Sequence, residues 1–121
     1  MEIISYKNLI VWQKSIELVL EVYQLTDHFP KEEIFGLTSQ MRRSAVSIAS
    51  NIAEGRSRGY RKEFKQFLSN AFGSGAELET QLLIAKKLPK TNHLNYKRCD
   101  SLLEEIMKML NSLLQKLKTN S

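Results

Sequence analysis

The sequence predicts an all-α protein, an antiparallel up-down-up-down four-helix bundle. Four segments of roughly 17 to 29 residues repeat apolar side chains every three or four positions, the spacing that places them on one face of an α-helix. The connections are short, and the prolines, Pro30 and Pro89, fall between segments. No alternating pattern indicates a β-strand. Because 121 residues suffice for one core but not for two ordinary domains, we expect residues 1–121 to form a single domain.

The first helix is expected over residues 8–27, with Asn8 as its cap and Phe29-Pro30 after its end. Two apolar stripes run along it. One stripe holds Leu9, Trp12, Ile16, Val19, Leu20 and Tyr23, and the other holds Val11, Leu18, Val22 and Leu25. One bundle core does not cover both stripes, so the second stripe predicts an interface with another copy of the chain. The alternative is a single broad apolar face that wraps around the helix.

The second helix is expected over residues 37–54, followed by Gly55 where a left-handed residue would end it. Its buried face carries Leu37, Met41, Ala45, Ile48 and Ile52. The opposite side is small and apolar where a surface helix would carry charge, and we interpret it as a second packed face. The alternative is that Ala and Ser there simply favour helix in water. This side adds three candidate interface residues: Val46, Ala49 and Ala53.

The third helix is expected over residues 60–88, where Phe64, Ala71, Leu78 and Ala85 recur every seven residues. Gly73 and Gly75 lie in its middle and should cost roughly 1 kcal/mol each relative to Ala, so we expect close packing or a kink there. The fourth helix is expected over residues 93–118, capped by Thr91 or Asn92. Its broad apolar stripe comprises Cys99, Leu102, Leu103, Ile106, Met107, Met109, Leu110, Leu113, Leu114 and Leu117.

No catalytic or metal site and no cofactor is indicated by the sequence. A di-metal bundle typically carries Glu-x-x-His on two helices, whereas Leu25 and Lys90 stand three residues before His28 and His93. Cys99 falls on an apolar stripe, which favours core packing over a nucleophile. The glycines of the third helix are not followed by the Gly-Lys-Ser/Thr of a phosphate-binding loop. We therefore expect a protein without enzymatic activity.

Polar residues flank the buried faces of the second and third helices. Among them, Arg43 and Glu77 are expected to pair between the two helices. Such a pair more often orients a bundle than performs catalysis, so we assign it a structural role.

The composition, 42% hydrophobic and 26% charged, is that of a folded globular protein. The most apolar window, residues 9–25, is interrupted by charged and amide side chains, so no membrane span is expected. The first residues lack the basic region and apolar run of a secretion signal, and the single cysteine cannot form an intramolecular disulfide. We therefore expect a cytoplasmic location.

A cluster of positive charge lies at the turn into the third helix. The chain carries a formal net charge of +5, which favours polyanionic partners. The cluster comprises Arg56, Arg58, Arg61, Lys62 and Lys65, and alternating helices add Lys7, Lys116 and Lys118 at the same end. We expect this end to bind RNA or DNA phosphates, with ordinary solvated charge as the alternative. Tyr60 could stack on a base, but its helical phase predicts that it joins the core face, so it receives no binding role.

Six segments carry a resemblance to a known family. They are Leu9-x-x-Trp12-Gln13, Phe29-Pro30, Phe35-Gly36-Leu37-Thr38-Ser39-Gln40-x-Arg42-Arg43, Val46-Ser47-Ile48, Asn51-Ile52-Ala53-Glu54-Gly55 and Glu77-Leu78-Glu79-x-Gln81-Leu82. In this combination the chain resembles the four-helix-bundle family named for proteins encoded in intervening sequences of 23S ribosomal RNA genes. That family is similar to the accessory protein of diversity-generating retroelements, a basic bundle that forms a ring of five subunits and engages reverse transcriptase and nucleic acid. The resemblance implies a non-enzymatic homo-oligomer, a pentamer, without implying the same partners. The expectation also admits a protein partner beside the nucleic acid.

These observations lead to one functional hypothesis and one rival. The hypothesis is a non-enzymatic homo-oligomeric binding module that contacts RNA or DNA through the basic end of the bundle. The rival is a structural or protein-interaction bundle with no nucleic-acid role, in which the charge only keeps the protein soluble.

Overall fold

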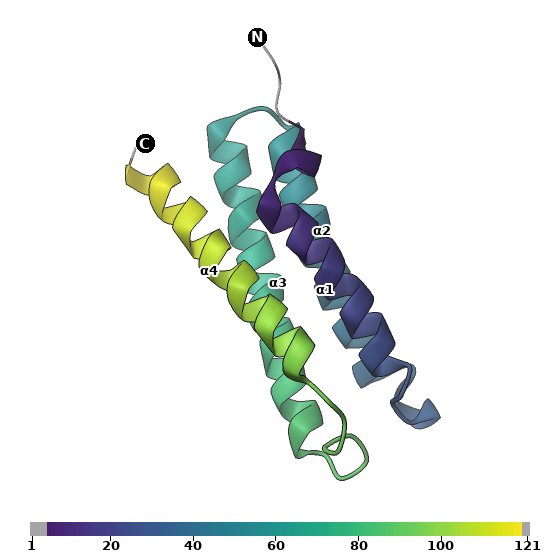
Figure 1. Ribbon diagram of the computed structural model, residues 1–121. Coiled ribbons are helices and arrows are strands. Elements are labelled where there is room, and N and C mark those ends of the chain that lie inside the picture. The colour runs from purple at the N-terminus through teal and green to yellow at the C-terminus, as the bar shows by residue number, and fades with distance from the viewer. Residues whose placement is uncertain (1–4, 120–121) are drawn as a thin grey trace.

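The computed structural model describes residues 5–119, which form four α-helices and two single-turn 3₁₀ helices, with no β-strand in that range. The elements are η1 (Tyr6–Asn8), α1 (Ile10–Thr26), η2 (Lys31–Glu33), α2 (Leu37–Ser57), α3 (Arg61–Lys87) and α4 (Lys97–Thr119). The predicted all-α four-helix fold is confirmed, and Figure 1 shows that successive helices run in alternating directions. No helix in the described range is long and apolar enough to cross a membrane. The secretion-signal prediction concerns residues 1–4, which lie outside the described residues.

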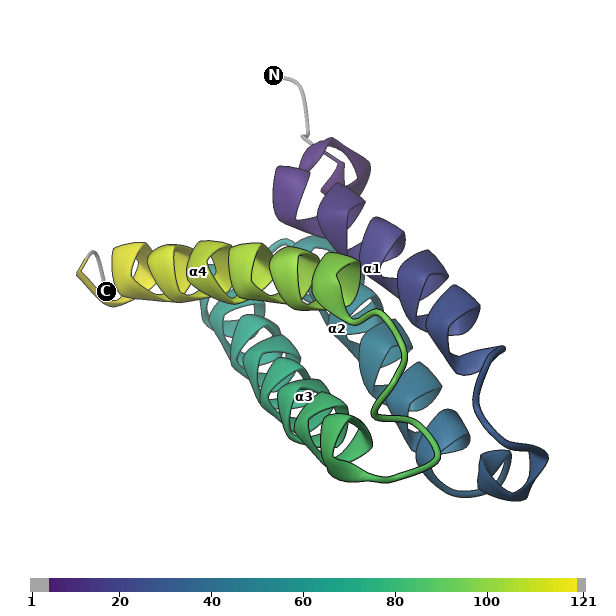
Figure 2. The same ribbon diagram turned by 60° about the horizontal axis from the view of Figure 1, so that its bottom comes forward.

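The four helices enclose one shared hydrophobic core. α2 and α3 form the most extensive contact, and each of α1 and α4 packs against two neighbours, α1 against α2 and α4, and α4 against α1 and α3. In Figures 1 and 2, α4 diverges from α1 toward its C-terminal end. For this reason Leu113, Leu114 and Leu117 are only partly buried, whereas Leu102, Ile106 and Leu110 are buried completely. The apolar stripe of α4 is therefore buried most completely from Cys99 to Leu110.

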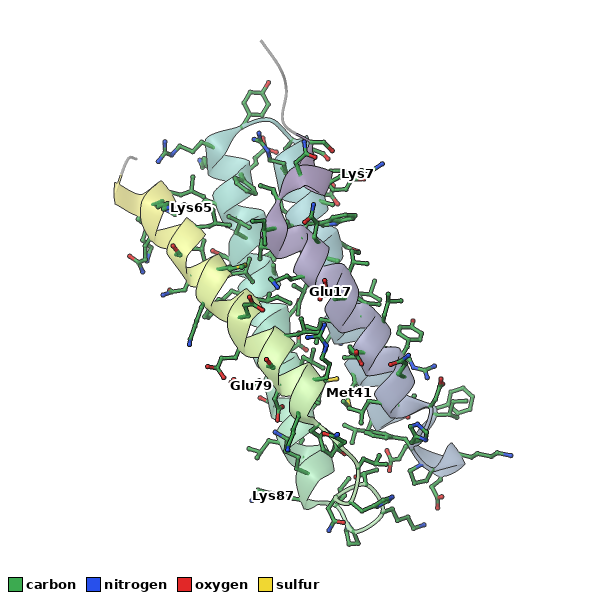
Figure 3. The ribbon with its side chains drawn as sticks, in the orientation of Figure 1. Lys7, Glu17, Met41, Lys65, Glu79 and Lys87 are labelled. Atoms are coloured by element: carbon green, nitrogen blue, oxygen red, sulfur yellow. The ribbon has the colours of Figure 1, made fainter. Side chains whose placement is uncertain are left out.

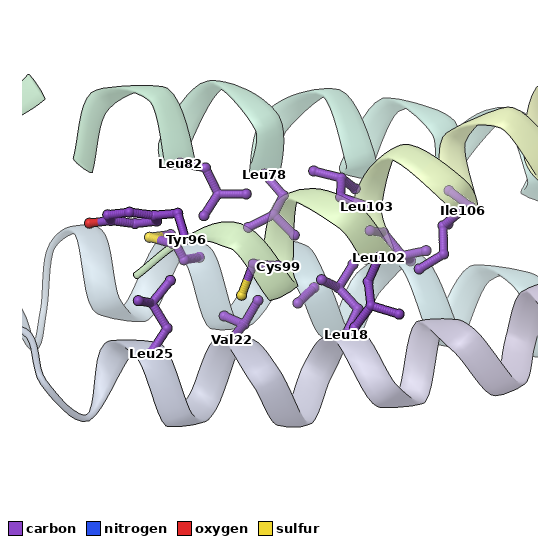
Figure 4. Packing of buried hydrophobic residues seen from close by; sticks show 14 of the residues in the cluster. Leu18, Val22, Leu25, Leu78, Leu82, Tyr96, Cys99, Leu102, Leu103 and Ile106 are labelled. Atoms are coloured by element: carbon purple, nitrogen blue, oxygen red, sulfur yellow. The ribbon is translucent and has the colours of Figure 1, made fainter. Parts of the chain in front are cut away.

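The assignment of the α1 stripes was wrong. Val11, Leu18, Val22 and Leu25 are 3%, 0%, 0% and 7% exposed in the single chain, so they belong to its own core and cannot form an interface with another copy. Figure 4 shows Leu18, Val22 and Leu25 directed toward α4, where Cys99 and Leu102 meet them. The other stripe faces outward in part, and Leu20 is 62% exposed. Both stripes have helical spacing, so only the simultaneous packing of α1 on α2 and α4 decides which is buried.

The side of α2 that carries small residues is also buried only in part. Ala49 is 6% exposed and therefore buried within the chain, which contradicts its candidate place in an interface between copies. Val46 is 40% exposed and Ala53 is half-buried, so both remain accessible. Ala49 lies two turns after Arg42, which contacts α1 at Thr26, and about half a turn around the helix from Ser47, which contacts α3, so it lies on the side of α2 that packs against α1.

Two predicted helix starts lie too early. Asn8 does not cap α1, because it belongs to η1, where the Ser5 hydroxyl accepts a hydrogen bond from the Lys7 amide at 3.2 Å. The fourth helix begins at Lys97 rather than near residue 93, and neither Thr91 nor Asn92 caps it. Instead the buried Thr91 hydroxyl donates to the Ala85 carbonyl at 2.6 Å, which fastens the loop to the end of α3.

The C-terminal end of α2 differs from the prediction at Gly55. The helix continues to Ser57, and the left-handed residue is Gly59, with φ of 78°. Gly55 is buried against α3, and a Cβ atom there would stand 2.6 Å from the Cβ of Phe67. Gly55 is therefore a contact residue between the two helices, and Gly59 makes the turn.

The predicted close packing in the middle of α3 holds at one of its two glycines. Gly75 lies against the thioether of Met107 on α4, whereas nothing lies within 4 Å of a Cβ built on Gly73. The helix passes through both positions without interruption. Gly75 thus allows α4 to approach α3, and Gly73 has no packing reason to be glycine.

Candidate nucleic-acid interface

The fold gathers the predicted cationic residues at one end of the bundle. The turn from α2 to α3, the C-terminal end of α4 and η1 meet there, and Figure 3 shows Lys7 and Lys65 at this end and Lys87 at the opposite one. We call this surface the basic end. It comprises Lys7, Arg56, Arg58, Arg61, Lys62, Lys65, Lys116 and Lys118, together with the acidic residues Glu54 and Glu63.

Arg61 connects α3 to α4. Its guanidinium donates to the carbonyl oxygens of Leu117 at 3.1 Å and of Lys116 at 3.4 Å. Carbonyls in the last turn of a helix lack intrahelical donors, and a cation there also complements the helix dipole. Arg61 therefore holds the end of α4 beside the start of α3, and part of its hydrogen-bonding capacity is already used.

Arg58 joins α2 to α3 in a comparable way. Its guanidinium lies 2.9 Å from a carboxylate oxygen of Glu54 and 3.5 Å from one of Glu63, and it stands 5.2 Å from the centre of the Phe67 ring. Two carboxylates compensate one guanidinium, so Arg58 adds little net charge to the surface. Its role in the structure is to fix the turn.

The remaining cations at the turn are available for a ligand. Arg56 places its guanidinium 6.0 Å from the centre of the Phe64 ring, a weak cation–π contact, and forms no ion pair with the described residues. Lys62 is exposed and Lys65 is half-buried, and neither ammonium group pairs with a carboxylate of the described residues. Arg56, Lys62 and Lys65 therefore carry positive charge that no carboxylate of residues 5–119 compensates through an ion pair.

Tyr60 does not join the core face, which corrects the prediction from its helical phase. It precedes α3 in an extended conformation, with φ of −116° and ψ of 137°, and is 69% exposed. The left-handed Gly59 turns the chain just before it, so the helical phase of α3 does not apply. Tyr60 borders a hollow of about 310 Å³. The other residues that line the hollow are Gly55, Arg56, Gly59, Arg61, Phe64 and Leu117.

At the opposite end Lys86, Lys90 and Arg98 are paired, whereas Lys31, Lys87 and Lys97 form no ion pair with the described residues. Lys86 contacts Asp100 at 2.6 Å, and Arg98 lies between two carboxylates of α1 at 3.3 and 3.5 Å. Lys90 contacts Glu32 at 2.7 Å, and this hydrogen bond and the opposite charge hold the pKa of the Glu32 carboxyl below its usual value and raise the pKa of Lys90. The field of these cations is therefore reduced by neighbouring carboxylates.

The predicted Arg43–Glu77 pair is present between α2 and α3, with 3.9 Å between its nearest charged atoms. Both side chains are mostly exposed, so the pair contributes little to stability. A shorter contact that the sequence analysis missed lies one turn further along α2, where the hydroxyls of Ser47 and Ser74 are 2.8 Å apart. The Asn51 amide donates to the Ser47 carbonyl at 2.8 Å. The antiparallel register of two small-residue helices could have suggested this contact.

Cys99 lies in the core, as its position on the apolar stripe predicted. It is 3% exposed, and burial, together with the nearby carboxylates of Glu21 and Asp100, raises the pKa of its thiol to about 11. The side chain stays protonated near neutral pH, whereas a nucleophilic cysteine reacts as the thiolate. His28, His93 and Cys99 line a second hollow, separate from the one beside Tyr60. Among the described residues, no three His, Cys, Asp or Glu side chains are grouped so that they could hold a metal ion.

Fold and surface together define an α-helical bundle in which the basic end carries eight basic residues against two acidic ones. The chain belongs to the 23S rRNA-intervening sequence protein family, whose model matches residues 7–112 and so includes most of α4. It is also similar to a crystal structure of a protein of unknown function from the S23 ribosomal protein family of Bacteroides thetaiotaomicron. That similarity has a TM-score of 0.71 and 25% identity, and covers 87% of this chain and 98% of the other. No curated protein matches the chain.

Proposed function

We propose that this protein is a non-enzymatic, homo-oligomeric binding module that contacts RNA or DNA through its basic end. One observation carries the nucleic-acid part. At the basic end eight basic residues stand against two acidic ones, and Arg56, Lys62 and Lys65 have no carboxylate partner among the described residues. At the opposite end acidic side chains pair with Lys86, Lys90 and Arg98, although Lys31, Lys87 and Lys97 form no ion pair with the described residues. Uncompensated cations gain most from meeting phosphates, because binding releases the counterions condensed on the nucleic acid.

Self-association is supported by exposed apolar side chains near the C-terminal end of α1. We call this group the apolar patch, and it consists of Leu20, Tyr23, Ile34, Phe35 and Val46. Phe35 is 93% exposed, and Tyr23, Ile34 and Val46 border one shallow hollow, with Arg42 placed 4.4 Å from the centre of the Tyr23 ring. Exposed large apolar side chains gathered in one region of the surface commonly mark a protein–protein contact. The proposed interface is therefore the apolar patch and not the buried stripe of α1.

Oligomerisation would multiply the effect of each basic end. Several basic ends that engage one polyanion act at high effective concentration, so the assembly binds more tightly than a single copy. The resemblance to the ring-forming accessory protein makes five the expected number of subunits, and it leaves room for a protein partner. We also propose a cytoplasmic location, where a reducing environment keeps the buried, unpaired Cys99 as a thiol.

Removal of three cations from the basic end tests the nucleic-acid part. We expect the variant Arg56→Gln/Lys62→Gln/Lys65→Gln to bind labelled single-stranded RNA at least about tenfold more weakly at moderate ionic strength, since each lost phosphate contact weakens binding and flattens the salt dependence. The matched control is Lys31→Gln/Lys87→Gln/Lys97→Gln, which removes the same charge at the opposite end without breaking an ion pair of the described residues. Fluorescence anisotropy at two salt concentrations measures both.

Two outcomes would reject the nucleic-acid part. If the wild-type protein binds neither RNA nor DNA at low salt, the structural or protein-interaction bundle becomes the better hypothesis. If the control variant loses as much affinity as the basic-end variant, binding depends on total charge and not on this surface.

Replacement of Phe35 tests self-association. We expect Phe35→Ser to lower the molar mass measured by light scattering, because a side chain 93% exposed in one copy stabilises an assembly only through another copy. The control is Leu83→Ser on α3, which removes an exposed apolar side chain outside the apolar patch. A wild-type mass of about 14 kDa at all concentrations would overturn this part of the proposal.

A further inference from the structure

The hollow beside Tyr60 differs chemically from the rest of the basic end. Phosphate contacts need only exposed cations, yet this hollow is also lined by two aromatic residues and a leucine. The aromatic residues are Tyr60 and Phe64, the charge comes from Arg56 and Arg61, and the leucine is Leu117. Its volume of about 310 Å³ is at the lower limit of ordinary ligand sites, and is enough for one planar ring system.

The backbone around the hollow leaves the ring of Tyr60 accessible. Gly59 adopts φ of 78°, and a Cβ built on it would meet no atom within 4 Å, so the space in front of the turn is open. The Tyr60 hydroxyl makes no hydrogen bond in the described part of the chain, and its side chain lies outside the core cluster. Neither a core contact nor a hydrogen bond accounts for a large aromatic residue at this position.

Proteins that bind single-stranded nucleic acid combine these same elements. They stack bases on exposed aromatic side chains, with guanidinium groups beside them, and they hold the phosphates with a positive surface. Here the stacking ring and the uncompensated cations follow one another in the chain, from Arg56 through Tyr60 to Lys65. We infer that the hollow takes one unpaired base, stacked on Tyr60, with Arg56 and Lys62 on the adjoining phosphates.

This inference rests on the proposed function and makes it more specific. A base inside a duplex hides both of its faces against its neighbours, so only a single strand, a loop or a strand end can offer a face to Tyr60. The ligand would therefore be single-stranded RNA or DNA. Because every base has a π-face, the hollow would select for unpaired nucleotides with little preference among sequences.

A stacking-sensitive probe tests the inference directly. The probe is a single-stranded RNA of about twelve nucleotides, within the usual site sizes, that carries one 2-aminopurine, whose fluorescence falls when it stacks on an aromatic ring. With the wild-type protein we expect binding accompanied by quenching. Tyr60→Ala should bind the probe roughly tenfold to a hundredfold more weakly and abolish the quenching. Tyr60→Phe retains the ring and should behave as the wild type.

Duplex RNA of the same length separates stacking from phosphate binding. Affinity for the duplex should be the same for Tyr60→Ala and the wild type, since the duplex offers only phosphates to this surface. Circular dichroism on both Tyr60 variants checks that the fold is retained. Because Tyr60 is 69% exposed, we expect its replacement to leave the helices intact.

The outcomes distinguish this inference from the proposed function. If Tyr60→Ala binds and quenches the probe as the wild type does, while Arg56→Gln/Lys62→Gln/Lys65→Gln loses affinity, the basic end binds nucleic acid but the stacking site is wrong. If a polyglutamate peptide displaces the probe as well as an unlabelled strand of equal charge, the surface recognises acidic polymers and the inference is also wrong. Failure of the wild type to bind the probe at low salt would remove both proposals.

Discussion

Leu18→Ala is expected to lower the free energy of unfolding by about 2–5 kcal/mol, the usual cost of truncating a buried leucine. Leu18 is 0% exposed and lies where α1 faces α4, next to Leu102 in Figure 4. Removal of its isobutyl group would leave a cavity that the rigid helix backbones cannot fill completely. Chemical denaturation followed by circular dichroism at 222 nm measures the change at a protein concentration where light scattering shows single copies, since self-association would add to the apparent stability.

Leu20→Ala is the matched control, with the same chemical change two residues further along the same helix. Leu20 is 62% exposed, so its truncation should alter the free energy of unfolding of a single copy by no more than about 0.5 kcal/mol. A large cost for Leu20→Ala and a small one for Leu18→Ala would show that α1 is rotated relative to this structure. In that case the stripe of Val11, Leu18 and Val22 would again be a candidate interface.

Gly55→Ala is expected to destabilise the protein by about 1–3 kcal/mol, although alanine favours helix over glycine. The new methyl group would stand 2.6 Å from the Cβ of Phe67 and 3.4 Å from the Cα of Phe64. These atoms are close to or part of the α3 backbone, so a rotamer change cannot move them away. α2 and α3 would have to separate, which loosens the largest helix–helix contact of the bundle.

Gly73→Ala is the matched control, because it changes only the helix propensity of the residue and adds no steric contact. No atom lies within 4 Å of a Cβ built on Gly73, so this substitution should stabilise the protein by about 0.5–1 kcal/mol. Thermal unfolding of the two variants should therefore give shifts of opposite sign. An increase in melting temperature for Gly55→Ala would mean that α2 and α3 are not in the close contact described here.

The positions of the helices could be predicted from the sequence, because helical spacing is a local property. Pro30 and Pro89 separate segments whose apolar residues recur every three or four positions, and a helix exists in each. The exact ends were less predictable. Glycine often ends a helix, but the contact of Gly55 with Phe67 keeps it inside α2. Such contacts are decided by residues that are distant in sequence.

The candidate site was also predictable only in part. The basic cluster could be predicted, since Arg56 to Lys65 are neighbours in the sequence and carry their charge in any conformation. Which of these charges is available could not. Glu54 and Glu63 engage Arg58, and the last carbonyls of α4 engage Arg61, because the fold brings their helices together. The helical phase of the third helix predicted that Tyr60 joins the core. The left-handed Gly59 turns the chain just before Tyr60, so Tyr60 is exposed instead.

By itself the amino-acid sequence determined that the chain is an all-α four-helix protein with a positive cluster at the turn into its third helix. Both follow from the order of residues along a few turns, where 3.6-residue geometry fixes which side chains share a face. Only the tertiary structure decided which stripe of α1 is buried, that Gly55 is a helix contact, and that Tyr60 faces solvent beside unpaired cations. Each of these depends on the rotation of one helix relative to its neighbours, and that rotation is set by packing among residues far apart in the chain.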